Sequence, residues 1–232
     1  AIKDAVEFDG DLSEFFQFVS TDEQFFYSND DAGRQRYLDE STAFIDNMKA
    51  LLPEYFGILP KADLVVKRVE PFREQDGAAA HYFGSSPDGS IPGTYYVHLS
   101  DMSANPITEL EAVAYHEGLP GHHMQIAIAR ELESVPSFRS QAGFTAYSEG
   151  WGLYTELLSK EMGAYQDPYS DFGRLVGEMW RAVRLVVDTG IHAMGWTEQQ
   201  AVDYFANNVS TPLPSIVSEI RRYTVLPGQA TS

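Results

Sequence analysis

The pair Pro120-Gly121 constrains the fold more than any other feature, because it interrupts a helical pattern that carries functional side chains. Apolar residues recur at helical spacing before it, and the pattern ends in His116-Glu117. Proline removes a helix hydrogen bond and clashes with the preceding turn, whereas glycine permits unusual backbone angles. We therefore expect the helix to break between His116 and the pair His122-His123.

His116-Glu117 matches the start of the zinc-hydrolase pattern H-E-x-x-H, in which two His lie four residues apart beside a Glu general base. Here the fourth position is Pro120, which cannot bind a metal. In an unbroken helix His123 would share the face of His116 but lie about 10 Å further along the axis. That is too far for zinc–nitrogen distances of about 2 Å. A bulge at Pro120 would return His122 or His123 to His116, and spacing alone does not choose between them.

A third ligand is expected from another helix. Glu149 lies in an apolar, glycine-containing stretch, where a buried carboxylate is costly unless it is paired or coordinating. Glu156 follows seven residues later and would share its face, as an alternative ligand or as the partner of one. Since the chain has no Cys, only His, Asp and Glu remain as ligands. Two His and one carboxylate suit zinc, so we expect one Zn²⁺ per chain.

Two residues are candidates for stabilising the oxyanion of a tetrahedral intermediate. His192 lies four residues after Asp188, so that on a helix the carboxylate could orient the imidazole. Tyr223 is the second candidate.

Two neighbouring tyrosines, Tyr95 and Tyr96, lie on a predicted strand that could bind an extended peptide at a sheet edge. His81 and His98 also fall on predicted strands, and we expect them to be structural.

The periodicity of apolar residues predicts helices, then a small sheet, then many helices. This order favours an α+β fold that is mostly helical, with a small antiparallel sheet packed against a multi-helix region. We expect one domain over 1–232, with helices in 1–60, the sheet in 61–104 and the helical region bearing the metal site in 105–232. The predicted helices cover 11–27, 30–56, 106–116, 124–132, 146–162, 169–189, 198–207 and 215–223, and the predicted strands 64–69, 78–83 and 94–99.

The charge of the chain argues against two kinds of partner. Its 34 acidic and 16 basic side chains give a formal charge of −18, which disfavours nucleic acid and anionic membranes. The chain contains no run of about 20 apolar residues, so its sequence predicts no membrane span. The chain starts at Ala1 without an initiator Met, so we expect a processed or truncated chain. The absence of Cys fits the cytosol and the periplasm alike.

Several segments together resemble the bacterial domain-of-unknown-function 885 (DUF885) family. The resemblance implies a zincin-like fold of the metallopeptidase clan and a zinc peptidase activity. It also implies that this chain is the C-terminal catalytic part of a longer protein. A periplasmic or exported location follows, with a lipid anchor possible on the missing N-terminal part. The segments that carry the resemblance are Asp88-Gly89-Ser90, Pro92-Gly93-Thr94-Tyr95-Tyr96, His116 to Gln125, Ser148-Glu149-Gly150-Trp151, Val187 to His192, and Arg222-Tyr223 with Pro227-Gly228-Gln229-Ala230.

The family pattern implies His116, His122 and Glu149 as metal ligands and Glu117 as the general base, which favours His122 over His123. One departure from the family pattern is Ile91, where the family tends to have Arg.

The leading hypothesis is a zinc-dependent metallopeptidase acting on a peptide or small-molecule substrate. The alternatives are a non-catalytic or decayed metal-binding module of an exported lipoprotein, and a metal hydrolase of non-peptide amides or esters.

Overall fold

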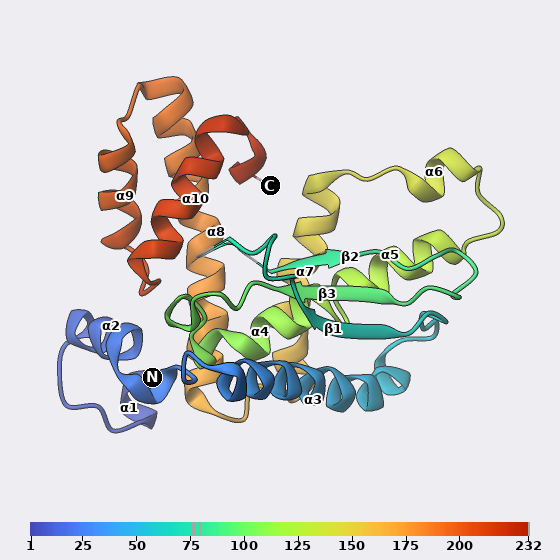
Figure 1. The fold of residues 1–232 in the computed structure, drawn as a ribbon, viewed down its shortest axis with the longest axis horizontal. Helices are drawn as coiled ribbons and strands as arrows, with labels where there is room; N and C mark the ends of the chain where they lie inside the picture. Colours follow the sequence, from blue (N-terminus) through green and yellow to red (C-terminus); the bar gives the residue numbers. More distant parts are fainter. Residues whose placement is uncertain (76–77, 79, 232) are drawn as a thin grey trace.

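The computed structural model describes residues 1–75, 78 and 80–231, and its elements follow the predicted order (Figure 1). The first part contains helices α1 (Ile2–Ala5), α2 (Leu12–Thr21) and α3 (Asp31–Tyr55), and strands β1 (Leu64–Arg68), β2 (His81–Phe83) and β3 (Gly93–Val97). The second part contains α4 (Ile107–Glu117), α5 (His122–Glu131), α6 (Ser137–Gln141), α7 (Thr145–Glu161), α8 (Pro168–Met194), α9 (Glu198–Ala206) and α10 (Leu213–Val225). Short 3₁₀ turns are η1 (Glu23–Phe25), η2 (Met102–Ala104) and η3 (Gln229–Thr231). The mostly helical α+β prediction is confirmed.

The sheet is mixed, so the prediction of a purely antiparallel sheet was wrong. Its strand order is β1-β3-β2, with Leu64 of β1 paired to Gly93 in parallel and His81 of β2 paired to Tyr96 in antiparallel. After β2 the chain turns back and inserts β3 between the two earlier strands. Strand order depends on which edge the chain joins, and short strand patterns do not encode it. The predicted strand 78–83 is observed only from His81, and Ala79 lies outside the described residues.

Helices α3 and α4 lie against one side of the sheet in Figure 1 and enclose the main apolar core with it. The Asp30 side chain caps α3 by accepting a hydrogen bond from the Gly33 N–H at 2.8 Å. The buried face of α3 repeats at helical spacing, as expected for an amphipathic helix. Its buried residues are Gly33, Tyr37, Ser41, Ile45, Met48 and Leu52. The predicted helix over 30–56 is confirmed to within one residue.

Helix α8 is the longest helix of the described chain and joins three packed regions. Its first turns contribute Phe172 and Val176 to an aromatic cluster around Phe15 of α2. Its last turns pack Val183 and Val187 into a core with α9 and α10. Between these regions α8 runs alongside α4, which carries His116 and Glu117 (Figure 1). Within the described residues, no helix is both long and apolar enough to cross a membrane.

Candidate metal centre

The predicted helix break is present and brings two histidines together. Helix α4 ends at Glu117 and α5 begins at His122. In the connection, the Gly121 N–H donates to the Tyr115 carbonyl at 3.0 Å. A Cβ on Gly121 would lie 1.9 Å from the His116 carbonyl oxygen, so only glycine allows this close return of the chain.

The break selects His122 rather than His123 as the neighbour of His116. The rings of His116 and His122 meet edge to face with centroids 4.7 Å apart. Ligand atoms of His116, Glu117 and His122 all lie within 4.8 Å of one another, and all three residues are buried. Spacing along the sequence does not distinguish His122 from His123, whereas the direction of α5 places His122 against His116.

His123 faces the sheet and makes two hydrogen bonds there. Its Nε2 donates to the Ala62 carbonyl at 3.0 Å, and its Nδ1 accepts from the Tyr82 hydroxyl at 3.0 Å. Both ring nitrogens are therefore used by the fold. Burial lowers the pKa of His123 to about 4, so the ring is neutral at pH 7.

Glu149 from α7 faces both His116 and His122. One carboxylate oxygen lies 3.6 Å from His116 Nε2, and the other lies 3.7 Å from His122 Nε2. Tetrahedral ligands about 2.1 Å from a zinc ion lie roughly 3.4 Å from one another. The spacing of these three groups therefore fits one zinc ion, with Glu117 beside them.

Glu156 lies on the other side of the His116 ring. Its carboxylate accepts a hydrogen bond from His116 Nδ1 at 2.7 Å. This leaves Nε2 of His116 facing Glu149, so Glu156 contacts the ring nitrogen that points away from Glu149 and His122.

Two contacts of α7 position its side chains against the break. The indole N–H of Trp151 donates to the Pro120 carbonyl at 2.9 Å, which ties α7 to the connection. Gly152 lies directly against His116, since a Cβ there would come within 2.6 Å of the imidazole Cε1.

A cation from α8 contacts the same groups. The Arg181 guanidinium Nη2 lies 2.7 Å from a Glu149 oxygen and 3.5 Å from His116 Nε2. These two side chains therefore already have a cation beside them.

The protonation tendencies of the four groups differ. Burial and the charge of His116 lower the pKa of His122 to about 4, which leaves its lone pair free at pH 7. Despite burial, contacts with His116 and the charge of Arg181 hold the pKa of Glu149 well below its usual range. Despite burial, Glu149 and Glu156 raise the pKa of His116. Burial raises the pKa of Glu117 to about 7, close to the value suited to a general base at neutral pH.

The structure gives His192, one of the two predicted oxyanion residues, a hydrogen-bond partner away from this cluster. His192 lies three turns beyond Arg181 on α8, about 16 Å along the axis, and its Nε2 donates to the Tyr223 carbonyl at 2.9 Å. Asp188 does not orient it, since the Asp188 carboxylate accepts from the Gly228 N–H at 3.0 Å. Tyr223 is fully buried, with its ring near the guanidinium groups of α8 and α10.

The predicted substrate-binding tyrosines lie on the central strand, not at an edge. Tyr95 is completely buried in the main core, and Tyr96 points to the other face, where it stacks on His81 with centroids 5.4 Å apart. Because β3 is paired on both sides, an extended peptide could add only to β1 or β2. His98 accepts a hydrogen bond from the Gln75 N–H, consistent with a structural role.

The sequence reasoning missed Arg181. Its signal was present as a polar stripe on an otherwise apolar helix, because Arg174, Arg181, Arg184 and Asp188 follow the helical spacing 7, 3 and 4. Arg174, Arg184 and Asp188 are all buried.

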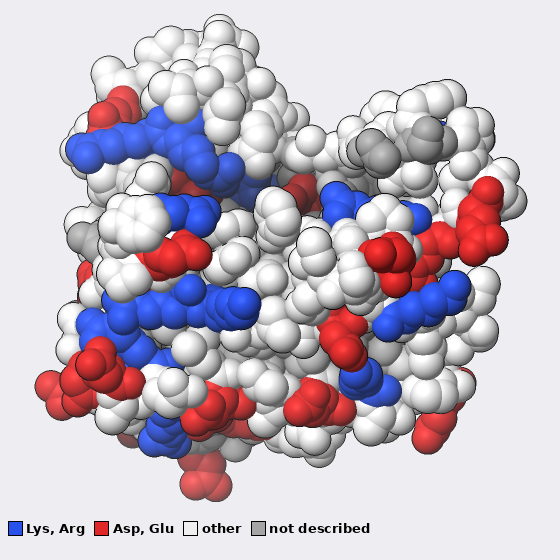
Figure 2. All heavy atoms as spheres, turned by 45° about the vertical axis from the view of Figure 1, so that its right-hand side comes forward, with Lys and Arg blue, Asp and Glu red and all other residues white. Residues whose placement is uncertain are grey.

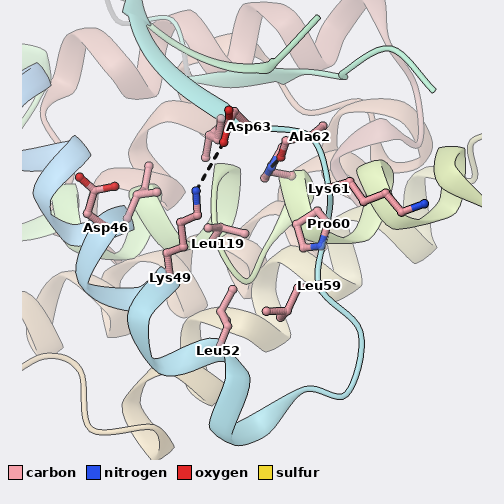
Figure 3. A pocket seen from close by; sticks show the side chains of 12 residues that line it. Asp46, Lys49, Leu52, Leu59, Pro60, Lys61, Ala62, Asp63 and Leu119 are labelled. Carbon is pink, nitrogen blue, oxygen red and sulfur yellow. Dashed lines mark hydrogen bonds and ion pairs between the residues drawn. The ribbon is translucent and has the colours of Figure 1, made fainter. Parts of the chain in front are cut away.

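A separate cavity of about 260 Å³ lies between α3, residues 59–64 and the start of the α4–α5 connection (Figure 3). Leu119 and His123 form part of its wall, and Lys49 of α3 pairs with Asp63 across it at 3.5 Å. The described residues that line this cavity do not include His116, His122 or Arg181, which face Glu149.

The chain belongs to the DUF885 family of bacterial proteins of unknown function, whose family pattern matches residues 1–232. No curated protein matches it. It is similar to a crystal structure named as a "putative lipoprotein" from Colwellia psychrerythraea, with 39% identity and a TM-score of 0.93. That match covers 99% of this chain and 40% of the other.

A second similar structure is named as a "putative lipoprotein of unknown function" from Shewanella oneidensis. It is 22% identical with a TM-score of 0.73, and the match covers 99% of this chain and 43% of that one. This second likeness shows the fold alone. The chain thus spans less than half the length of either structure.

Proposed function

We propose that this chain carries the active site of a zinc-dependent metallopeptidase of zincin-like type. The observation that carries the proposal is the arrangement of Glu149, whose two oxygens face Nε2 of His116 and of His122 at 3.6 and 3.7 Å. His116, His122 and Glu149 would hold one Zn²⁺. Bound zinc lowers the pKa of water towards about 7 and polarises a carbonyl group.

Glu117 is the general base in this proposal. It lies within 4.8 Å of both His ligands and is buried, so it can take a proton from water and deliver it to the leaving amine. Glu156 keeps the His116 ring oriented through Nδ1. Gly152 leaves the room that this ring occupies.

An exported location belongs to the same proposal. It rests on the similarity to the structure from Colwellia psychrerythraea and on that protein's name.

The test separates metal binding from turnover. Purified protein is loaded with zinc, dialysed and analysed for metal, then assayed on a peptide library by mass spectrometry. We expect one zinc per chain, and we expect Glu117→Gln to retain zinc while losing about 10²–10⁴-fold in activity. Glu161→Gln, an exposed change on α7, is the matched control and should behave as wild type.

Zinc binding without turnover in the wild type would favour a non-catalytic module instead. Metal-free protein after zinc loading would refute the proposal.

A further inference from the structure

A row of guanidinium groups leads away from the metal centre. Arg181 contacts Glu149, and Arg184 lies three residues further on the same face of α8. Arg222 joins them from α10, and attraction to Glu149 is among the effects that raise its pKa. The ring of Tyr223 lies between the two outer arginines, with its centroid 5.4 Å from Arg184 Cζ and 5.3 Å from Arg222 Cζ.

The charges along this row are unequally balanced. Arg181 pairs with Glu149, and Arg222 binds both oxygens of Glu219 at 2.9 and 2.5 Å. Arg184 is only 4% exposed, yet within the described residues it forms no ion pair. Its Nε is also buried without a hydrogen-bond partner among them. A buried cation is costly unless an anion compensates it, so Arg184 creates a strong preference for a negative group at its side.

A neutral amide oxygen lies at the place where that anion would bind. Gln229 Oε1 accepts from Arg222 Nη1 at 2.8 Å and from Arg184 Nη2 at 3.4 Å. The turn before it is held by Asp188, which accepts from the Gly228 N–H, and Gly228 has a positive φ of 81°. Paired guanidinium donors are the arrangement that recognises carboxylates.

The location relative to the metal centre identifies the carboxylate. Residues three apart on a helix have Cβ atoms about 5–6 Å apart, and one extended substrate residue spans about 3.3–3.6 Å. Because Arg181 contacts Glu149 directly, a carboxylate bound one helical turn further along α8 would be of the order of one or two extended residues from the metal centre. Figure 2 shows basic side chains running along the upper part of the molecule towards a notch whose floor carries both charges.

We propose that Arg184 and Arg222, with Arg181 beside them, bind the C-terminal carboxylate of a peptide substrate, so that the chain is a carboxypeptidase. The inference rests on the proposed zinc peptidase function. Water adds to the last or penultimate peptide bond, the C–N bond breaks, and the proton goes to the leaving amine. The products are a shortened peptide with a new carboxylate and a free amino acid or dipeptide. Gln229 occupies the subsite when it is empty and must turn outward for substrate.

The first test compares peptides that differ only at their C-terminus. Zinc-loaded protein is given one peptide as the free acid and as the amide, and the products are identified by mass spectrometry. We expect release of one or two C-terminal residues from the acid, and a kcat/KM for the amide at least 100-fold lower. Equal cleavage of both, or cleavage at internal bonds, would overturn the carboxypeptidase assignment while leaving the zinc peptidase intact.

The second test does not depend on catalysis. Binding of N-acetyl-phenylalanine and of its amide to zinc-free protein is measured by calorimetry. We expect the acid to bind at least tenfold more tightly than the amide, and Arg222→Gln to abolish that difference. Gln229→Glu would place a carboxylate between the two guanidinium groups, so it should raise Tm and weaken acid binding at least tenfold. Gln17→Glu, the same change on the exposed face of α2, should alter neither.

The outcomes separate the two proposals. Selective acid binding without any hydrolysis would leave the subsite standing and refute the peptidase. Equal binding of acid and amide, or no effect of Gln229→Glu on acid binding or Tm, would refute the subsite.

Discussion

Glu156 and His116 are joined by a 2.7 Å hydrogen bond through Nδ1, so the second ring nitrogen of His116 faces Glu149. Glu149 and Glu156 lie seven residues apart on α7 and approach one imidazole from opposite sides. Metal-binding histidines commonly donate their other N–H to a carboxylate, which fixes the tautomer and the ring orientation.

Replacing Glu156 by Gln should therefore weaken zinc binding without preventing it. We expect a loss of about 10–100-fold in affinity, because the amide no longer holds Nδ1–H as an anion does. Competition with a chelator of known affinity measures this. The exposed substitution Glu161→Gln on the same helix is the control, and an unchanged affinity in Glu156→Gln would contradict the assigned role.

Two glycines of α7 provide a matched pair. Gly152→Ala places a Cβ 2.6 Å from the His116 ring, whereas nothing lies within 4 Å of a Cβ on Gly150. Alanine favours a helix over glycine by about 1 kcal/mol, so Gly150→Ala should be stabilising and bind zinc normally. Gly152→Ala should displace His116 and lose at least tenfold in zinc affinity. Equal affinity in the two variants, measured by calorimetry, would show that His116 does not need this space.

The two adjacent histidines should have separable roles. His122→Ala should lose zinc binding, because its Nε2 is one of the two nitrogens facing Glu149. His123→Ala should keep one zinc per chain but lower the free energy of unfolding by about 1–3 kcal/mol, since Tyr82 and Ala62 lose a buried hydrogen-bond partner. Elemental analysis and urea unfolding test both. If His123→Ala loses zinc and His122→Ala retains it, then His123 rather than His122 is the metal ligand.

The helix break could be predicted from the sequence because it follows from local backbone chemistry. Pro120 cannot continue α4, and Gly121 accommodates a return that any Cβ would block. The choice between His122 and His123 could not be derived from spacing, since it depends on the direction in which α5 leaves the break. The family resemblance favoured His122, in agreement with the observed geometry.

The errors arose where long-range contacts decide the structure. Tyr95 and Tyr96 were expected near a sheet edge, but β3 joined the sheet between its two neighbours. His192 was expected near the reacting groups, but the carbonyl it binds belongs to Tyr223 of α10, 31 residues away. Arg181 lies on the polar stripe of α8, but its pairing with Glu149 depends on how α7 packs, which the sequence of α8 does not specify.

A pH-dependent effect on stability is expected from Glu109, two turns before His116 on α4. Burial and the charge of Glu156 raise the pKa of Glu109 from 4.5 to about 7. Between these values the unfolded chain has released a proton that the folded chain keeps, so this group lowers stability as pH rises through that window. Glu109→Gln should therefore match wild type at pH 4 and be more stable by about 1–3 kcal/mol at pH 7.

Urea unfolding at several pH values measures this difference. The exposed substitution Glu54→Gln on α3 is the control. Its free energy of unfolding should differ from that of the wild type by the same amount at every pH in this range. If the stability of Glu109→Gln relative to wild type does not increase between pH 4 and pH 7, the raised pKa of Glu109 is contradicted.

The proposed zinc site can be tested by anomalous scattering at the zinc edge from crystals grown with zinc. One peak is expected about 2.0–2.2 Å from Nε2 of His116, Nε2 of His122 and a carboxylate oxygen of Glu149, with the Arg181 guanidinium moved away from it. A peak bound by His123 or by Glu156, or no peak at this cluster, would contradict the proposed site.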